Sequence, residues 1–192
     1  VVSPAGIWLA LLDSAQTNLE VWNITNKTLR GQFRAEVSNS TNYRAQFSQP
    51  DDRLILISGS DVQLLNLNSG AFSPVMGHDQ VVSDAALSPD KTLVVVSTFG
   101  QLNNQSGGIL KLWDAAAGKD MGALLMARGQ GSRVIFSKND RLLAASTGNA
   151  IQIWNTENWE MLALLEGHEG RITDLSFSPN QRVLVSASHD GT

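Results

Sequence analysis

The stretch Leu87-Ser88-Pro89-Asp90-Lys91-Thr92-Leu93-Val94-Val95-Val96 decides the fold, because a short polar turn opens directly onto an apolar strand and this arrangement recurs. Turns of the same kind recur about every 40 to 49 residues, and they begin at Ser3, Ser48, Ser88, Ser137 and Ser178. A second marker, an apolar strand end followed by Asn or Asp, comes after each of the first four turns. These markers are Val21-Trp22-Asn23, Leu64-Leu65-Asn66, Leu112-Trp113-Asp114 and Ile153-Trp154-Asn155. Two markers in fixed phase indicate one repeated structural unit.

Each unit has the pattern of short strands. An apolar run such as Leu93–Val96 follows each turn, and a run of that length bounded by turn residues is typical of a buried strand. An alternating strand such as Leu110–Trp113 comes next, and a further turn leads to a fourth strand. Four antiparallel strands in about 43 residues describe one blade of a β-propeller. The sequence therefore predicts an all-β protein with about 4.5 four-stranded blades, which is a partial ring.

Individual motifs resemble a known family. Gly77-His78, Leu87-Ser88-Pro89-Asp90 and Leu112-Trp113-Asp114 together look like one WD repeat, and residues 167–192 look like the start of another. The chain is thus similar to the WD-repeat (WD40) β-propeller family, over essentially its whole length. The second unit departs from the pattern with Leu65 in place of Trp, and the fourth has Arg128-Gly129 in place of Gly-His.

The resemblance implies one partial propeller over residues 1–192, taken from a longer one. Its repeat units are expected at 1–34, 35–76, 77–126, 127–166 and 167–192, with the first and last incomplete. Propellers of this family usually close with about seven blades. An open ring would leave strand edges exposed, so a homo-oligomer is a possible arrangement if the ring is truly open.

Composition excludes several classes of function. The net charge is -4 and Lys and Arg are scattered, so no nucleic-acid partner is expected. The absence of cysteine excludes disulfides, thiolate metal sites and a Cys nucleophile. No apolar run approaches the roughly 18 to 20 residues that span a bilayer. We expect no membrane segment, and a cytoplasmic location is slightly favoured.

Three polar residues of the last unit have the residue types of a hydrolase triad, with Ser186 as nucleophile, His168 as base and Asp190 as orienter. The resemblance implies a different role, a hydrogen-bonded tetrad of His, Ser or Thr, Asp and Trp that ties the strands of one blade together. We therefore expect structural roles for His78, Ser97, Trp113, Trp154, His168, Ser186 and Asp190. The three histidines lack the spacing of a metal site, so neither a metal nor a cofactor is expected.

Binding is expected on the loops instead. The polar, Gly-rich segment Phe99–Gly108 is about five residues longer than its equivalents and is predicted to be a surface loop. The candidates for contact with a protein or peptide partner are Asn103, Asn104, Gln105, Arg128, Gln130, Arg133, Glu169, Arg171 and His189. The sequence thus predicts a non-catalytic interaction module or scaffold. The alternative is a sensor or substrate gate of a larger hydrolase, protease or kinase whose catalytic domain lies outside these residues.

Overall fold

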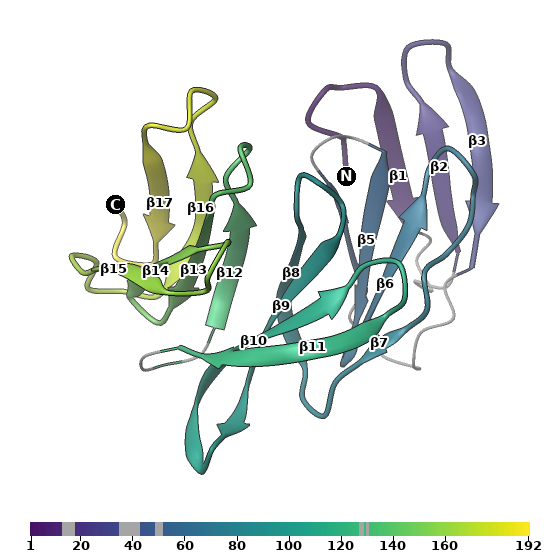
Figure 1. Cartoon of the computed structure of the whole chain (residues 1–192). Coiled ribbons are helices and arrows are strands. Elements are labelled where there is room, and N and C mark those ends of the chain that lie inside the picture. The colour runs from purple at the N-terminus through teal and green to yellow at the C-terminus, as the bar shows by residue number, and fades with distance from the viewer. Residues whose placement is uncertain (13–17, 35–42, 49–51, 127–128, 130) are drawn as a thin grey trace.

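The computed structural model describes residues 1–192 apart from 13–17, 35–42, 49–51, 127–128 and 130. The regular elements of the described residues are seventeen β-strands, so the predicted all-β class is confirmed (Figure 1). The described residues contain no helix of the length and apolarity needed to cross a bilayer.

The strands form five antiparallel sheets that follow one another along the chain. The first sheet has three strands, which are β1 (Trp8–Leu12), β2 (Leu19–Asn23) and β3 (Thr28–Phe33). The second has four, which are β4 (Tyr43–Phe47), β5 (Arg53–Ser58), β6 (Asp61–Asn66) and β7 (Met76–Gly77).

The remaining sheets repeat this plan. The third consists of β8 (Val82–Leu87), β9 (Leu93–Leu102), β10 (Gln105–Asp114) and β11 (Lys119–Leu125). The fourth consists of β12 (Gly131–Phe136), β13 (Leu142–Thr147), β14 (Ala150–Asn155) and β15 (Met161–Leu165). The fifth consists of β16 (Ile172–Phe177) and β17 (Leu184–Ser188).

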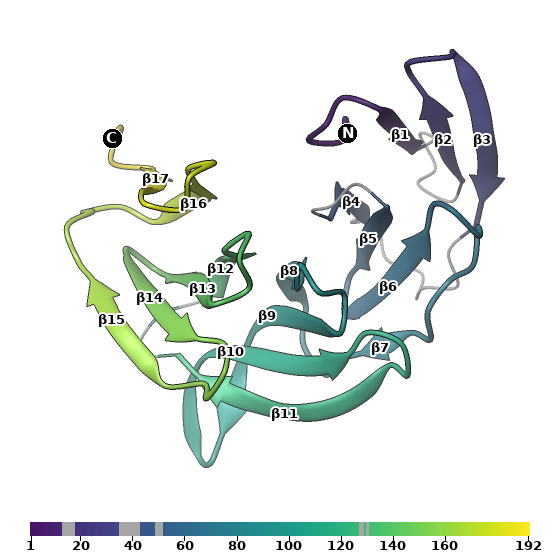
Figure 2. The ribbon, with the colours of Figure 1, turned by 45° about the horizontal axis from the view of Figure 1, so that its top comes forward.

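The sheets stand side by side around an open arc (Figure 2). The first strands β4, β8, β12 and β16 lie toward the inside of the arc, and β7, β11 and β15 lie toward its outside. On the inside, β12 lies against both β8 and β16. This is the arrangement of propeller blades, and the five sheets do not close into a ring.

The repeated serine turns have one geometry, which explains their recurrence in the sequence. Ser88 accepts the Leu93 N–H at its Oγ, 3.0 Å away, and donates the hydroxyl proton to Asp90 at 2.6 Å. Its carbonyl accepts the Lys91 N–H at 2.9 Å, and Lys91 has a φ of 66°. The same bonds to the serine Oγ and carbonyl recur in the turns at Ser137 and Ser178. A serine therefore both closes each turn and starts the strand that follows it.

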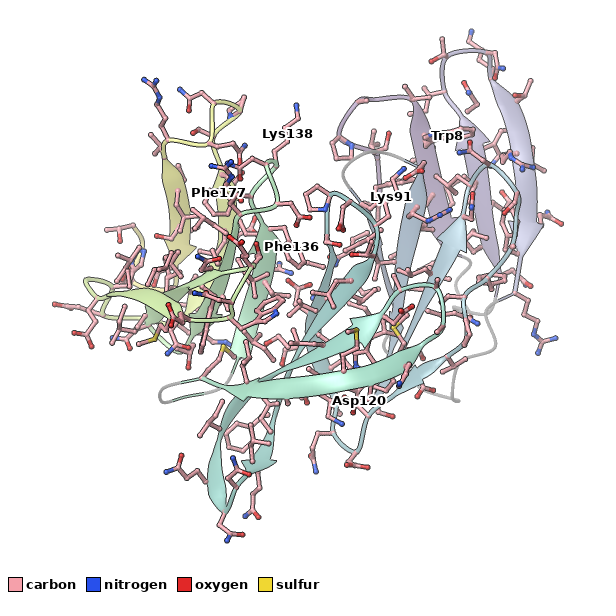
Figure 3. The ribbon with its side chains drawn as sticks, viewed as in Figure 1. Trp8, Lys91, Asp120, Phe136, Lys138 and Phe177 are labelled. Carbon is pink, nitrogen blue, oxygen red and sulfur yellow. The ribbon has the colours of Figure 1, made fainter. Side chains whose placement is uncertain are left out.

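Apolar side chains fill the spaces between neighbouring sheets. Successive residues of a strand point to opposite faces. Val94 and Val96 of β9 thus join the core shared with the second sheet, whereas Val95 joins the core shared with the fourth. All three are 0% exposed, and burial of each such side chain contributes about 1.5 to 3 kcal/mol. Phe136 and Phe177, labelled in Figure 3, end β12 and β16 and pack against the next two cores along the chain.

The segment Phe99–Gly108, which was expected to be a loop, is a regular hairpin of paired strands. Strand β9 continues to Leu102 and β10 starts at Gln105, and these two residues pair directly. Asn103 and Asn104 form the two-residue turn with φ values of 52° and 63°. Two positive φ values are typical of a type I′ hairpin turn, which favours Asn and Gly. The inserted residues therefore lengthen the two paired strands. The hairpin projects beyond the rest of its sheet (Figure 1).

Candidate functional site

Charged residues occupy equivalent positions on the four inner strands. Each precedes the serine of its turn by four residues, and together they alternate in sign: Arg44, Asp84, Arg133 and Asp174. Because the inner strands lie next to one another, each charge has an opposite charge on the neighbouring sheet. The repeat thus places a ladder of alternating charge along the inside of the arc.

Ion contacts connect the members of this ladder. Asp84 Oδ1 lies 3.6 Å from the Nη1 of Arg44 and 3.9 Å from the Nη1 of Arg133. Arg133 Nε lies 3.6 Å from Asp174 Oδ1. The two arginines also donate to main-chain carbonyls of the following sheet, Arg44 to Ser83 at 2.9 Å and Arg133 to Thr173 at 2.7 Å. One Arg–Asp pair therefore recurs every two sheets.

Asp84 is the buried member of the ladder, with a side chain only 4% exposed. Burial raises the pKa of its carboxyl group, and the Val134 N–H, Arg133 and Arg44 oppose that shift. The Val134 N–H donates to Asp84 Oδ2 at 3.1 Å. A buried carboxylate is costly unless it is paired. The two arginines are therefore drawn toward one fixed point between the second, third and fourth sheets.

A pocket of about 290 Å³ opens beside this ladder. Below, "arginine pocket" denotes the pocket lined by Arg44, Val81, Val82, Ser83, Arg133, Arg171, Ile172, Thr173 and His189. Three of these residues carry a guanidinium group, and no acidic residue is among the lining residues that the structure describes. Since the chain as a whole has a net charge of -4, this basic character is local.

The arginine pocket brings together three of the residues predicted to contact a partner, Arg133, Arg171 and His189. His189 donates its N–H to the Arg171 carbonyl at 3.0 Å, which holds the two residues side by side. Arg44 was not among the contact residues predicted from the sequence. Its position four residues before Ser48, which matches that of Arg133 before Ser137, is the signal that could have found it.

The other predicted contact residues lie elsewhere. Asn103 and Asn104 form the tip of the β9–β10 hairpin, and Gln105 follows them. Glu169 precedes β16 and donates its N–H to Asp190 at 2.9 Å, but it does not line the pocket. Arg128 and Gln130 lie outside the described residues.

The fifth sheet holds His168, Ser186 and Asp190 in mutual contact. His168 Nε2 lies 2.8 Å from Ser186 Oγ, and its Nδ1 lies 2.9 Å from Asp190 Oδ2. Asp190 also accepts the N–H of Thr192 at 2.9 Å and its hydroxyl at 2.6 Å. Bonds from Thr192 are the main reason that the pKa of Asp190 lies far below its usual range, and bonds from His168 and Glu169 add to this. The network joins the loop before β16 to β17 and to the turn after it.

Comparison with known proteins supports the resemblance to WD-repeat proteins. The profile described as "WD domain, G-beta repeat" matches residues 159–192, which include this network. Protein tipD of Dictyostelium discoideum is 31% identical over 134 residues, which are 62% of this chain and 22% of tipD. The WD repeat-containing protein WDS homolog of Arabidopsis thaliana is 26% identical over 148 residues, which are 74% of this chain and 27% of that protein. Residues 159–192 thus match a WD repeat, and the chain is similar to a WD-repeat protein over most of its length.

A further relative is the p21-activated protein kinase-interacting protein 1-like of Gallus gallus. It is 31% identical over 83 residues, which are 43% of this chain and 22% of that protein. The chain spans less than a third of the length of each of these three relatives.

The third WD repeat keeps part of the expected network. Trp113 donates its indole N–H to His78 Nε2 at 3.1 Å, and His78 Nδ1 lies 3.0 Å from the Ser60 carbonyl. Burial lowers the pKa of His78. A neutral ring that donates from Nδ1 and accepts at Nε2 fits both contacts.

The prediction that Ser97 occupies the network position was wrong by one residue. In the fifth sheet, Ser186 pairs with Leu175, which lies three residues before the turn serine Ser178. In the third sheet, the residue three before the turn serine is Ala85, and its partner is Val96. Ser97 therefore points to the opposite face of the sheet, where it lies against Gly131. A Cβ atom added to Gly131 would be only 2.2 Å from the Ser97 Oγ. Its buried hydroxyl has no hydrogen-bond partner among the described residues.

Trp154 of the fourth WD repeat also differs from the expectation. It packs in the core between the third and fourth sheets, and only 8% of it is exposed. Its indole Nε1 has no hydrogen-bond partner in the described part of the chain. The residue at the His position of this repeat is Gly129, which has no side chain to accept the bond. Trp154 is thus an apolar packing residue and not a member of a polar network.

Two further observations concern possible ligands. A larger pocket of about 660 Å³ lies between the turns at Ser88 and Ser137, and both Asp90 and Asp140 line it. Burial, and then the charge of Asp90, raise the pKa of Asp140. Within the described ranges no three His, Asp or Glu side chains are grouped so that they could hold a metal ion.

Proposed function

We propose that this chain is a protein-interaction module without catalysis of its own, and that it binds a partner at the end where the inner strands begin. The observation that carries the proposal is the arginine pocket, which four different sheets build. Arg44 comes from β4, Ser83 from β8, Arg133 from β12 and Thr173 from β16. A peptide segment in this pocket would contact several blades at once.

The hairpin of the third blade extends the same end of the molecule. Val82 at the start of β8 pairs with Thr98, from which β9 continues outward to Leu102. The start of β12 and the hairpin tip both lie in the lower part of Figure 1. The amide side chains of Asn103, Asn104 and Gln105 therefore offer polar contacts beyond the pocket, as expected for the rim of an interface.

The relatives support a protein partner. The relative from Gallus gallus is named for its interaction with a protein kinase. We apply to this chain only the general property, the binding of another protein. The name of this relative supports a role in interactions, and none of the three names supports the alternative of a gate for an attached enzyme.

We further propose that His168, Ser186 and Asp190 have a structural role despite their triad-like order. Asp190 accepts hydrogen bonds from the backbone of Glu169 and from both Thr192 donors, so its carboxylate fastens a loop and a turn as well as orienting the imidazole. Ser186 lies within β17, paired with Leu175 of β16. Ser186 thus connects strands β16 and β17 to the loop that carries His168.

A steric block tests the proposed binding surface without changing its charge. Val81 lines the arginine pocket and is 69% exposed, whereas Val183 lies at the opposite end of the fifth sheet and is 53% exposed. Peptides selected from a random library against the full-length protein should bind the wild type. Val81→Trp should weaken that binding at least about tenfold, which is about 1.4 kcal/mol. Val183→Trp should leave it unchanged.

Two results would contradict the proposal. One is a library that yields no peptide bound by the wild-type protein. The other is a set of peptides whose affinity falls with Val183→Trp and not with Val81→Trp. Circular dichroism of both variants would show that each retains its β structure.

A further inference from the structure

The geometry points to a side chain with an oxyanion, either a carboxylate or a phosphate, as the group of the partner that the arginine pocket binds. This inference rests on the proposed function, because it names the chemistry of the partner at the same site. The shared feature of the two groups is a set of charged oxygens that accept parallel N–H bonds from a guanidinium group.

Arg44 and Arg133 have more N–H donors than their described acceptors use. A guanidinium group carries five N–H donors in a fixed fork. Among the described residues, Arg44 donates a hydrogen bond to one acceptor, the Ser83 carbonyl. Arg133 likewise donates to one acceptor, the Thr173 carbonyl. The contacts of both arginines with Asp84 Oδ1 are 3.6 Å and 3.9 Å long, beyond hydrogen-bond distance. Donors of both side chains thus remain for a ligand.

The lining of the pocket is positively charged. Arg44, Arg133 and Arg171 line the pocket, whereas the carboxylate of Asp84 lies beneath it and is only 4% exposed. Asp174 contacts Arg133 at 3.6 Å from a position that is 73% exposed, where solvent screens the pair. Three guanidinium groups thus line the pocket, and no carboxylate is among its described lining residues. The resulting positive charge favours an anionic ligand.

Two arginines of the pocket are held in place before any ligand binds. Arg44 and Arg133 come from different sheets, and each is held by a carbonyl of the next sheet and by attraction to the same carboxylate. Their side chains are 48% and 31% exposed, so they are partly ordered by the protein while remaining open to solvent. A ligand then loses less affinity to the ordering of long side chains. Asp84 is therefore a positioning residue for the guanidinium groups of Arg44 and Arg133.

The size of the pocket limits the ligand. A volume of about 290 Å³ lies at the lower end of the range for ligand pockets. It suits one amino-acid side chain and its neighbours, not a dinucleotide or an extended polymer. A net charge of -4 also opposes a polyanion at long range. A single acidic or phosphorylated residue in a peptide is therefore favoured over RNA, and RNA is an outcome that the test must separate.

The experiment uses the full-length protein and fluorescence anisotropy with one library-selected peptide made in three forms. The anchor residue is Ala, Glu or phosphoserine. We expect the Glu or the phosphoserine form to bind at least about tenfold more tightly than the Ala form. A larger gain for phosphoserine would identify a phosphate as the ligand, and an equal gain would identify a carboxylate charge as sufficient.

Two arginine variants form the matched comparison. Arg171→Ala removes a cation that lines the pocket, and Arg182→Ala removes one from the turn at the opposite end of the same sheet. Arg171→Ala should abolish most of the gain from the charged anchor, and Arg182→Ala should preserve it. Raising the salt concentration should reduce the gain.

The outcomes separate this inference from the proposed function. If the three peptides bind equally and Val81→Trp still blocks them, the site is an interaction surface but the inference is wrong. The inference also fails if Arg171→Ala and Arg182→Ala have equal effects. It fails as well if a short single-stranded RNA displaces the peptide at the same concentration as the phosphoserine peptide does. If no peptide binds the wild type, the proposed function itself fails.

Discussion

Arg133 of β12 donates its Nε–H to the Thr173 carbonyl of β16 at 2.7 Å, and this bond repeats the one from Arg44 to Ser83 between β4 and β8. The sheets are thus joined in pairs by an arginine at a fixed repeat position. Asp84 joins the pairs to each other, since it lies within 4 Å of both guanidinium groups. The arginines that line the pocket therefore also hold the blades together.

Arg133→Ala should lower the free energy of unfolding by about 1 to 3 kcal/mol, because it removes an inter-sheet hydrogen bond and one of the two cations beside buried Asp84. Arg182→Ala should change it by no more than about 0.5 kcal/mol, as is usual for exposed positions. Urea denaturation of both variants measures the difference. Equal stabilities would show that the charge ladder does not hold the sheets.

Trp113 and Trp154 allow one hydrogen bond to be isolated, because both indoles are 8% exposed and only Trp113 bonds to a histidine. Trp113→Phe leaves His78 Nε2 buried without a donor, and Trp154→Phe removes an indole N–H that has no described partner. We expect Trp113→Phe to cost about 1 to 3 kcal/mol more than Trp154→Phe. Thermal unfolding would test this, and a larger loss for Trp154→Phe would contradict the assignment.

Ser97 and Ser186 test the register of the two networks. Ser186 bonds to His168 at 2.8 Å, whereas the Ser97 hydroxyl is buried and has no partner in the described residues. Ser186→Ala should destabilise the protein by about 1 kcal/mol, and Ser97→Ala should be neutral or stabilising. Melting temperatures of the two variants would decide. The opposite order would return Ser97 to the network position.

Asp140 has a φ of 59° and a carboxylate that is close enough to Asp90 for its charge to raise the pKa of Asp140. Asp140→Gly should therefore stabilise the protein by about 0.5 to 1 kcal/mol, since Gly adopts this conformation without strain. Gln181→Gly, at the same φ of 59°, should gain less. It loses the bonds of Gln181 to the Lys138 N–H and the Ser178 carbonyl.

Asp190 gives a prediction about pH. Its pKa is depressed below the ordinary value of about 3.9, so its contribution to stability is present above that value and is lost as the pH falls through the folded-state pKa. Asp190→Asn should thus lower the melting temperature at pH 7, and the difference from wild type should shrink below about pH 4. A difference that stays constant between pH 7 and pH 3 would rule out this linkage.

The sequence predicted the blades because their signals are local. The turn at Ser88 and the apolar run after it depend on bonds within six residues, so composition and order suffice. Ser97 was misplaced because adjacent strand residues face opposite sides. Counting eight residues from Ser88, as from Ser178 to Ser186, leads to Val96.

The arginine pocket was only partly predictable. Arg133 and Arg171 were found as loop candidates, but the contacts of Arg44 and Arg133 with Asp84 depend on how separate sheets stand side by side. No pattern within one repeat shows that three strands share a carboxylate. The hairpin at Asn103 and Asn104 was mistaken for a loop because Gly-rich polar sequences are common to both.

The most direct test of the account is a site-specific photo-crosslink from the pocket rim to the bound peptide. A photoreactive amino acid replaces Val81, which lines the arginine pocket, or Val183, which lies at the opposite end of the fifth sheet. The account predicts a crosslink from position 81 to residues beside the acidic or phosphorylated anchor, and none from position 183. A crosslink from position 183 alone would contradict it.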